Sequence, residues 1–138
     1  MERLQELMQS DARFAPRNAT VAIIEDDIAV RNGLAFALQT EGLSVRAYGC
    51  AEDLLKDGLV VEIDCLVVDY KLPNMNGHDL LKELRRRGIA APAILIATEP
   101  SAAVRAAVGL MGVTIVEKPL LTDELYDLIA LKMRRPSA

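Results

Sequence analysis

Five short apolar runs, separated by segments of helical spacing, constrain the fold of this chain more than any other feature. Each run has three to five residues, which suits a buried strand. The segments between the runs repeat apolar residues at intervals of three and four, as amphipathic helices do. Strands that alternate with helices form a parallel sheet covered by helices on both faces. The predicted strands are Val21–Ile24, Leu43–Ala47, Leu66–Val68, Ala93–Ala97 and Val113–Val116.

The predicted helices have recognisable ends. The first, Asp27–Gln39, ends near Gly42, and glycine is the residue type that most often follows a helix. We interpret Ile28, Leu34 and Leu38 as one apolar stripe of this helix. The other predicted helices are Ala51–Lys56, His78–Arg87, Ser101–Met111 and Asp123–Met133. We therefore expect one doubly wound α/β domain, from about residue 19 to about residue 134.

The composition narrows the class of protein. The chain has 138 residues, of which 51% are hydrophobic and 4% aromatic, so its core is built from Leu, Ile, Val and Ala. The net charge of -4 argues against a general nucleic-acid binder. No window is apolar for long enough to span a membrane, and residues 1–18 lack the apolar core of a signal peptide. We therefore expect a cytoplasmic protein.

Two end segments lie outside the expected domain. Residues 1–18 form an N-terminal extension, and residues 135–138 form a short tail. The apolar residues of the extension follow a rough helical spacing that Pro16 ends: Leu4, Leu7, Met8 and Phe14. Two interpretations stay open for this extension. It is either a helix that docks on the domain or on a second copy of the chain, or a partly ordered leader.

The cysteines and the histidine predict no metal or catalytic site. Cys50 and Cys65 form no CxxC pair, and no Cys/His cluster is available for zinc. Cys65 opens a buried strand, where we interpret it as a packed free thiol. His78 follows Gly77 at a helix start and is interpreted as a solvated polar residue rather than a base.

Polar residues follow four of the predicted strands, where the chain leaves the core. Glu25 and Asp26 follow the first strand, Asp69 follows the third run, Thr98 the fourth and Lys118 the fifth. The carboxyl ends of parallel strands meet at one edge of the sheet, where ligands bind in this class of fold. Carboxylates that converge there repel one another unless a cation lies between them, and oxygen ligands suit Mg²⁺ better than zinc. With a lysine added, the set can handle a phosphoryl group, and Asp69 can act as an attacking carboxylate.

Each of these residues also has an ordinary structural interpretation. Asp26 or Asp27 can cap the first helix, and a lysine before proline is usually a surface residue. The combination of these residue types on the right strands is what favours a phosphoryl or Mg²⁺ site.

Three stretches carry a resemblance to a known family: "AIIEDDIAVRNGLAFAL", "VVDYKLPNMNG" and "VEKPL". They resemble the response-regulator receiver domain of two-component signalling, over about residues 20–133. The resemblance implies the flavodoxin-like strand order 2-1-3-4-5 with helices on both faces. It also implies a phosphorelay signalling module rather than an enzyme, since a receiver catalyses only its own phosphorylation and slow dephosphorylation. Its partners would be a histidine kinase or histidine phosphotransfer protein and a downstream protein target, with a homodimer also open.

The resemblance assigns roles to individual residues. Asp69 would be the phosphoacceptor, and Lys118 would pair with the phosphoryl oxygens. Asp26, Asp69 and the backbone carbonyl of Lys71 would bind Mg²⁺ directly, while Glu25 would help through a water molecule. Pro73 and Gly77 would shape the loop that holds Asp69 at the mouth of the crevice.

The chain departs from the family pattern at its switch residues. Receivers usually have Thr or Ser at the end of the fourth strand, where Ala97 falls by counting and Thr98 follows one position later. We favour Ala97 at this position by strand parity, with Thr98 as the alternative. Ile115 takes the place of the usual aromatic residue, and the segment from Ala97 to Lys118 is about one residue shorter than is typical. Glu99 adds a negative charge nearby.

Three functions compete. A stand-alone receiver without an output domain is favoured, because only a few residues follow the last predicted helix, which leaves no room for a DNA-binding unit. The alternative is a phosphate-independent, receiver-like adaptor, although such a protein would be expected to lose the acidic site. A phosphatase of the haloacid-dehalogenase type needs a second acid two residues after the nucleophile, and Lys71 stands there.

Overall fold

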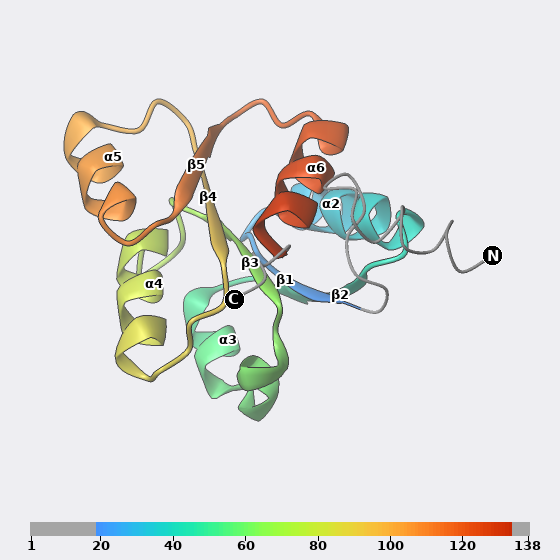
Figure 1. Cartoon of the computed structure of the whole chain (residues 1–138), viewed down its shortest axis with the longest axis horizontal. Coiled ribbons are helices and arrows are strands. Elements are labelled where there is room, and N and C mark those ends of the chain that lie inside the picture. The colour runs from blue at the N-terminus through green and yellow to red at the C-terminus, as the bar shows by residue number, and fades with distance from the viewer. Residues whose placement is uncertain (1–18, 134–138) are drawn as a thin grey trace, which may run out of the picture.

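The computed structural model describes residues 19–133, which alternate between strands and helices (Figure 1). The predictions for residues 1–18 and 135–138 lie outside these described residues. No helix within the described range is long and apolar enough to cross a membrane. The elements are β1 (Thr20–Ile24), α2 (Ile28–Thr40), β2 (Ser44–Tyr48), α3 (Ala51–Lys56), the 3-10 helix η1 (Gly58–Glu62), β3 (Cys65–Asp69), α4 (Gly77–Arg86), β4 (Ala93–Ala97), α5 (Ala102–Gly109), β5 (Thr114–Glu117) and α6 (Thr122–Met133).

The five strands form one parallel sheet in the order β2-β1-β3-β4-β5, which confirms the predicted flavodoxin-like topology. Helices α2 and α6 lie on one face, and α3, α4 and α5 lie on the other (Figure 1). Successive strand side chains alternate between these layers. Val68 of β3 belongs to the buried cluster that includes α4, whereas Val67 belongs to the cluster that includes α2 and α6. Both faces of the sheet are therefore buried, which explains why its strands read as continuous apolar runs.

The predicted elements agree with the structure except in details. Most boundaries shift by a residue or two, and η1 has no counterpart among the predicted elements. The predicted apolar stripe of α2 is wrong at Ile28, whose side chain is 64% exposed, whereas Leu34 and Leu38 are buried. Residues 28 and 34 are six positions apart, which turns their side chains about 120° away from each other around a helix.

The helix ends use the polar residues that the sequence offers. Asp27 caps α2, because its Oδ1 accepts a hydrogen bond from the Val30 amide at 3.1 Å. Ser101, predicted as the first helical residue, is instead the cap of α5. Gly42 follows α2 with φ of +92°, a left-handed conformation that glycine adopts without strain. The predicted end of the first helix near Gly42 is thus confirmed.

The loop after β3 is closed by a near approach of α4 to the strand end. The Gly77 amide donates to the Tyr70 carbonyl at 2.8 Å, and the Met75 amide donates to the Pro73 carbonyl at 2.7 Å. A Cβ at position 77 would lie 2.6 Å from the carbonyl oxygen of Asp69 and 2.8 Å from Cδ1 of Leu95. Only glycine fits there, since two of the three nearest atoms are backbone atoms that cannot turn away. Gly77 thereby allows the first turn of α4 to lie directly against the end of β3.

We expect Gly77→Ala to lower the free energy of unfolding by about 1–3 kcal/mol, the usual range for overpacking a closed site. Gly33→Ala is the matched control, because a Cβ there meets nothing within 4 Å on α2. That variant should gain about 0.5–1 kcal/mol from helix propensity. Urea unfolding of both variants measures the difference. If Gly77→Ala and Gly33→Ala have equal free energies of unfolding, α4 does not pack closely against the end of β3.

Candidate functional site: an acidic cluster at the strand ends

Three carboxylates meet at the carboxyl edge of the sheet. Asp69 is the last residue of β3, and Glu25 and Asp26 directly follow the neighbouring strand β1. One carboxylate oxygen from each residue lies within 4.8 Å of those of the other two. Glu25 and Asp69 are buried, whereas Asp26 is exposed. The structure thus brings together the acidic residues that the sequence predicted to converge.

Lys118 completes the cluster from the end of β5, the strand at one edge of the sheet. It follows β5, and its amide donates to the Ala97 carbonyl at 3.0 Å, which fixes the strand end beside β4. Its Nζ lies 3.1 Å from Oδ2 of Asp69 and 3.7 Å from Oε1 of Glu25. Burial acts to lower the pKa of the ammonium group, but the bond to Asp69 and the surrounding carboxylates raise that pKa overall. Lys118 therefore stays positively charged in this setting.

One ammonium group would not balance three ionised carboxylates. Oε2 of Glu25 is buried and has no hydrogen-bond partner among the described residues. Burial, and then the neighbouring Asp69, raise the pKa of Glu25 to about 8, because a second charge beside Asp69 in a buried place is unfavourable. An orphaned buried oxygen in an all-oxygen cluster fits a hard divalent cation, which would satisfy the oxygen and offset the charge. The residues present therefore fit Mg²⁺.

The loop beyond Asp69 holds its carboxylate in place from the other side. The Lys71 amide donates a long hydrogen bond of 3.4 Å to Oδ1 of Asp69, while the Lys71 side chain is exposed. Asp69 Oδ2 faces Lys118, so its two oxygens have different partners. The role of the Lys71 carbonyl as a metal ligand stays a prediction.

The two candidates for the switch position, Ala97 and Thr98, differ in burial. Ala97 is the last residue of β4, is buried and pairs with Glu117. Thr98, the other candidate, lies just beyond the strand and is exposed. Glu99 is also exposed and has a φ of +46°, which is uncommon for a residue with a side chain. Ile115 is half-buried and packs against the core layer that contains α4 and α5.

His78 and the two cysteines take no part in the cluster. His78 is half-buried in the first turn of α4, so its interpretation as a solvated side chain holds only in part. Cys65 is a buried free thiol, as predicted, and burial raises its pKa to about 12. Cys50 is a partly buried free cysteine at the start of α3.

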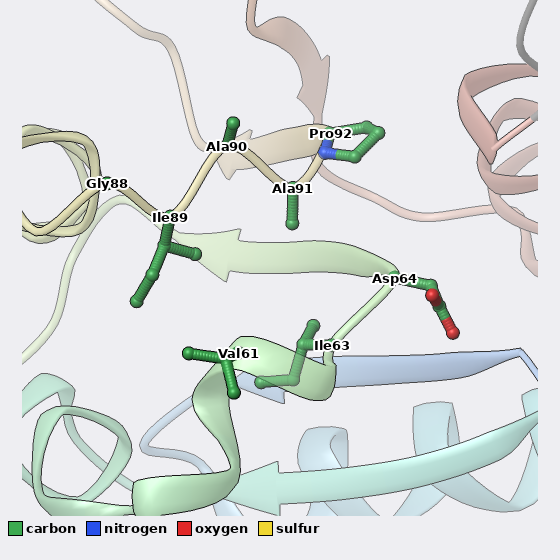
Figure 2. A pocket seen from close by; sticks show the side chains of 8 residues that line it. All are labelled: Val61, Ile63, Asp64, Gly88, Ile89, Ala90, Ala91 and Pro92. Atoms are coloured by element: carbon green, nitrogen blue, oxygen red, sulfur yellow. The ribbon is translucent and has the colours of Figure 1, made fainter.

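A separate cavity of about 280 Å³ opens at the opposite end of the sheet, between η1 and the segment that leads into β4. Figure 2 shows Val61 and Ile63 on one side of it and Ile89 on the other. Its only acidic lining residue is Asp64, which already accepts a hydrogen bond from the Thr20 amide at 2.8 Å. The surface of this cavity combines apolar side chains with polar atoms, and the acidic cluster lies at the other end of the sheet.

Sequence reasoning missed Arg31, a half-buried residue of α2 whose Nη1 donates to the Glu25 carbonyl at 2.9 Å. The available signal was a basic residue five positions after Asp26, on the helix that follows the acidic pair.

Comparisons with known proteins agree with this geometry. The family model of the response regulator receiver domain matches residues 21–130. Nodulation protein W of Bradyrhizobium diazoefficiens is 34% identical over 123 residues, which cover 88% of this chain and 54% of that protein. Transcriptional regulatory protein FixJ of Azorhizobium caulinodans is 40% identical over 83 residues, which cover 60% of this chain and 39% of that protein. The chain thus spans about half, or less, of the length of these curated relatives.

Solved structures show the same fold. The receiver domain of the Francisella response regulator 1452 superposes with a TM-score of 0.75 at 22% identity, covering 84% of this chain and 97% of that one. The response regulator StyR gives a TM-score of 0.75 at 29% identity, covering 84% of this chain and 59% of that one. With the family model matching most of its length, the chain belongs to the response regulator receiver domain family of two-component systems.

Proposed function

We propose that residues 19–134 form a receiver whose signalling state is set by phosphorylation of Asp69. The observation that carries this proposal is the contact between Asp69 and Lys118 at 3.1 Å, within an acidic cluster at the strand ends. Glu25 is farther from the lysine, at 3.7 Å, and its Oε2 has no partner. Asp69 is therefore the carboxylate best placed to carry a phosphoryl group that Lys118 can neutralise.

The proposed reaction is a transfer from a phosphohistidine of a kinase or phosphotransfer protein. An oxygen of Asp69 attacks phosphorus, an O–P bond forms, and the P–N bond to the histidine breaks with its electron pair returning to the imidazole nitrogen. Lys118 neutralises the oxygens of the transferred group. Mg²⁺, when bound, would shield the negative charge of the phosphoryl oxygens and of the carboxylates. Asp26, Asp69 and the Lys71 carbonyl would hold the ion, with Glu25 acting through a water molecule.

The proposal also covers the partner proteins of the receiver and its location in the cell. The receiver would act in the cytoplasm, take its phosphoryl group from a histidine kinase or phosphotransfer protein and signal through protein contacts, without binding DNA itself. The relatives described above include a transcriptional regulatory protein, of which this chain matches only part. The proposal therefore concerns the receiver domain alone.

The output would depart from the common Thr–aromatic arrangement. Ala97 has no hydroxyl to move toward a phosphoryl group, and Ile115 has no ring to turn. A change of state still requires contacts that differ between the two states. Exposed Thr98 and Glu99, on the loop between β4 and α5, are the groups of this loop that a dianionic phosphoryl group would attract or repel. We infer that phosphorylation reorganises this loop together with α5.

Acetyl phosphate with Mg²⁺ should add one phosphoryl group to the chain, measured by intact-protein mass. Asp69→Asn should abolish the gain, because the amide is not a nucleophile for this transfer. Asp53→Asn, which alters an exposed aspartate of α3, should label like the wild type. Labelling of Asp69→Asn at the wild-type rate would sink the assignment, and a wild type that never labels would favour the adaptor alternative.

Relief of carboxylate repulsion gives a separate test of the cation site. Asp26→Asn should raise the free energy of unfolding in EDTA by roughly 0.5–1 kcal/mol, because it removes one like charge near the surface. Mg²⁺ should stabilise the wild type by mass action but leave Asp26→Asn nearly unchanged. Thermal unfolding with and without Mg²⁺ measures both effects. Equal stabilisation of the two proteins by Mg²⁺ would exclude Asp26 as a ligand.

Amide hydrogen exchange tests the proposed output. Beryllofluoride with Mg²⁺ mimics the phosphorylated state and should change protection in residues 98–111, which include the loop after β4 and helix α5. Helix α3, which lies away from this segment in the sequence and beside β2, serves as an internal reference. Changes confined to the loop after Asp69, with residues 98–111 silent, would contradict the proposal.

A further inference from the structure

Arg31 holds the peptide bond that joins two of the three clustered acids. Its Nη1 donates to the Glu25 carbonyl at 2.9 Å, and this carbonyl belongs to the peptide unit between Glu25 and Asp26. The Glu25 amide in turn donates to the Tyr48 carbonyl at 3.0 Å, at the end of β2. Both polar backbone groups of Glu25 are thus bonded, one by the sheet edge and the other by a side chain.

The guanidinium group lies in a space that Gly49 leaves open. A Cβ at position 49 would lie 3.1 Å from Nη1 of Arg31 and 3.8 Å from its Cζ. Gly49 follows β2 directly, so Arg31 reaches from α2 to the turns that follow both β1 and β2. A half-buried side chain with its planar end placed between two turns has few alternative positions.

The position of this bond matters because the acids repel one another. One carboxylate oxygen from each of Glu25, Asp26 and Asp69 lies within 4.8 Å of those of the other two, and ionised carboxylates at this distance repel one another. The hydrogen bond of Arg31 goes to the Glu25 backbone carbonyl and not to a carboxylate oxygen. The contribution of Arg31 is the charge-assisted hydrogen bond to the backbone, which keeps the turn against the sheet edge.

We propose that Arg31 is a positioning residue for the divalent-cation site, acting through the Glu25–Asp26 peptide without contacting the ion. The inference rests on the cation site of the proposed function. Groups that orient metal ligands typically contribute 10–100-fold to metal affinity. Arg31 therefore sets how much Mg²⁺ the receiver needs, and Asp69 and Lys118 keep their own roles in phosphoryl transfer.

The test compares Mg²⁺ affinity in the full chain by isothermal titration calorimetry. Arg31→Met keeps the aliphatic stem and loses every donor, so its Kd for Mg²⁺ should rise about 10-fold or more. Arg31→Lys retains one charged donor and should recover part of the affinity. Arg85→Met is the matched control, because the half-buried Arg85 also donates to a single backbone carbonyl, that of Ile89, at 2.8 Å. The control should lose stability in urea while keeping its Kd within about twofold.

Two further measurements separate positioning from a loss of folding. The Mg²⁺ concentration that gives half-maximal phosphorylation by acetyl phosphate should rise for Arg31→Met by the same factor as its Kd. The rate at saturating Mg²⁺ should return close to that of the wild type, since the ligands themselves are intact. Gly49→Ala, which crowds the guanidinium group without removing a charge, should weaken Mg²⁺ binding in the same direction and by a smaller factor.

The outcomes distinguish this inference from the function it rests on. A wild type that binds Mg²⁺, together with Arg31→Met and Gly49→Ala variants of unchanged Kd, would overturn the role of Arg31 alone. A rate that stays low at saturating Mg²⁺ in a folded Arg31→Met protein would also overturn positioning as its role. A wild type that binds no Mg²⁺ would overturn the cation site itself. If Arg31→Met does not fold, the Gly49→Ala variant provides the test: a raised Kd for Mg²⁺ supports the role of Arg31, and an unchanged Kd overturns it.

Discussion

The crowding of three carboxylates beside one lysine is the interaction on which the site depends. Charges of like sign this close are unfavourable, and two of the three carboxylates are buried. The sheet enforces the arrangement because β1 and β3 are neighbours and their ends lie at the same edge. Hydrophobic packing on both faces of these strands supplies the stability that the charged edge lacks. The fold therefore holds in place a cluster that would disperse in a flexible chain.

The separation between packed strands and charged strand ends also explains which parts of the molecule the sequence predicts well. Asp69, Glu25 and Lys118 follow apolar runs, and a period of two or a continuous apolar run is a strong local signal. Once the strands are placed as parallel neighbours, the convergence of these residues follows from topology alone. The strand order itself came from the family resemblance, because several orders satisfy the same alternating pattern.

Other features depend on tertiary geometry that no local pattern contains. Ile28 is exposed because its position around α2 turns it away from the buried face. The six-residue spacing from Ile28 to Leu34 already contains this information, which the predicted stripe did not use. The short helix η1 joins α3 to β3 through residues that carry no helical period. Arg31 reads in the sequence as one more surface arginine, and only its distance to the Glu25 carbonyl reveals the contact. The burial of Ala97 and the exposure of Thr98 follow from the pairing of β4 with β5, which ends at Ala97.

The space at Gly49 has an evolutionary consequence. A Cβ at position 49 would lie 3.1 Å from Nη1 of Arg31, so a side chain there requires the guanidinium group to shift slightly. A lineage that replaces Arg31 with a shorter residue removes this constraint on position 49, whereas a lineage that keeps Arg31 favours the smallest residue there. Related receivers with arginine at the position of Arg31 should therefore keep glycine at position 49 more often than those without it. The contact should be visible as covariation between two residues that lie far apart in the chain and on different elements.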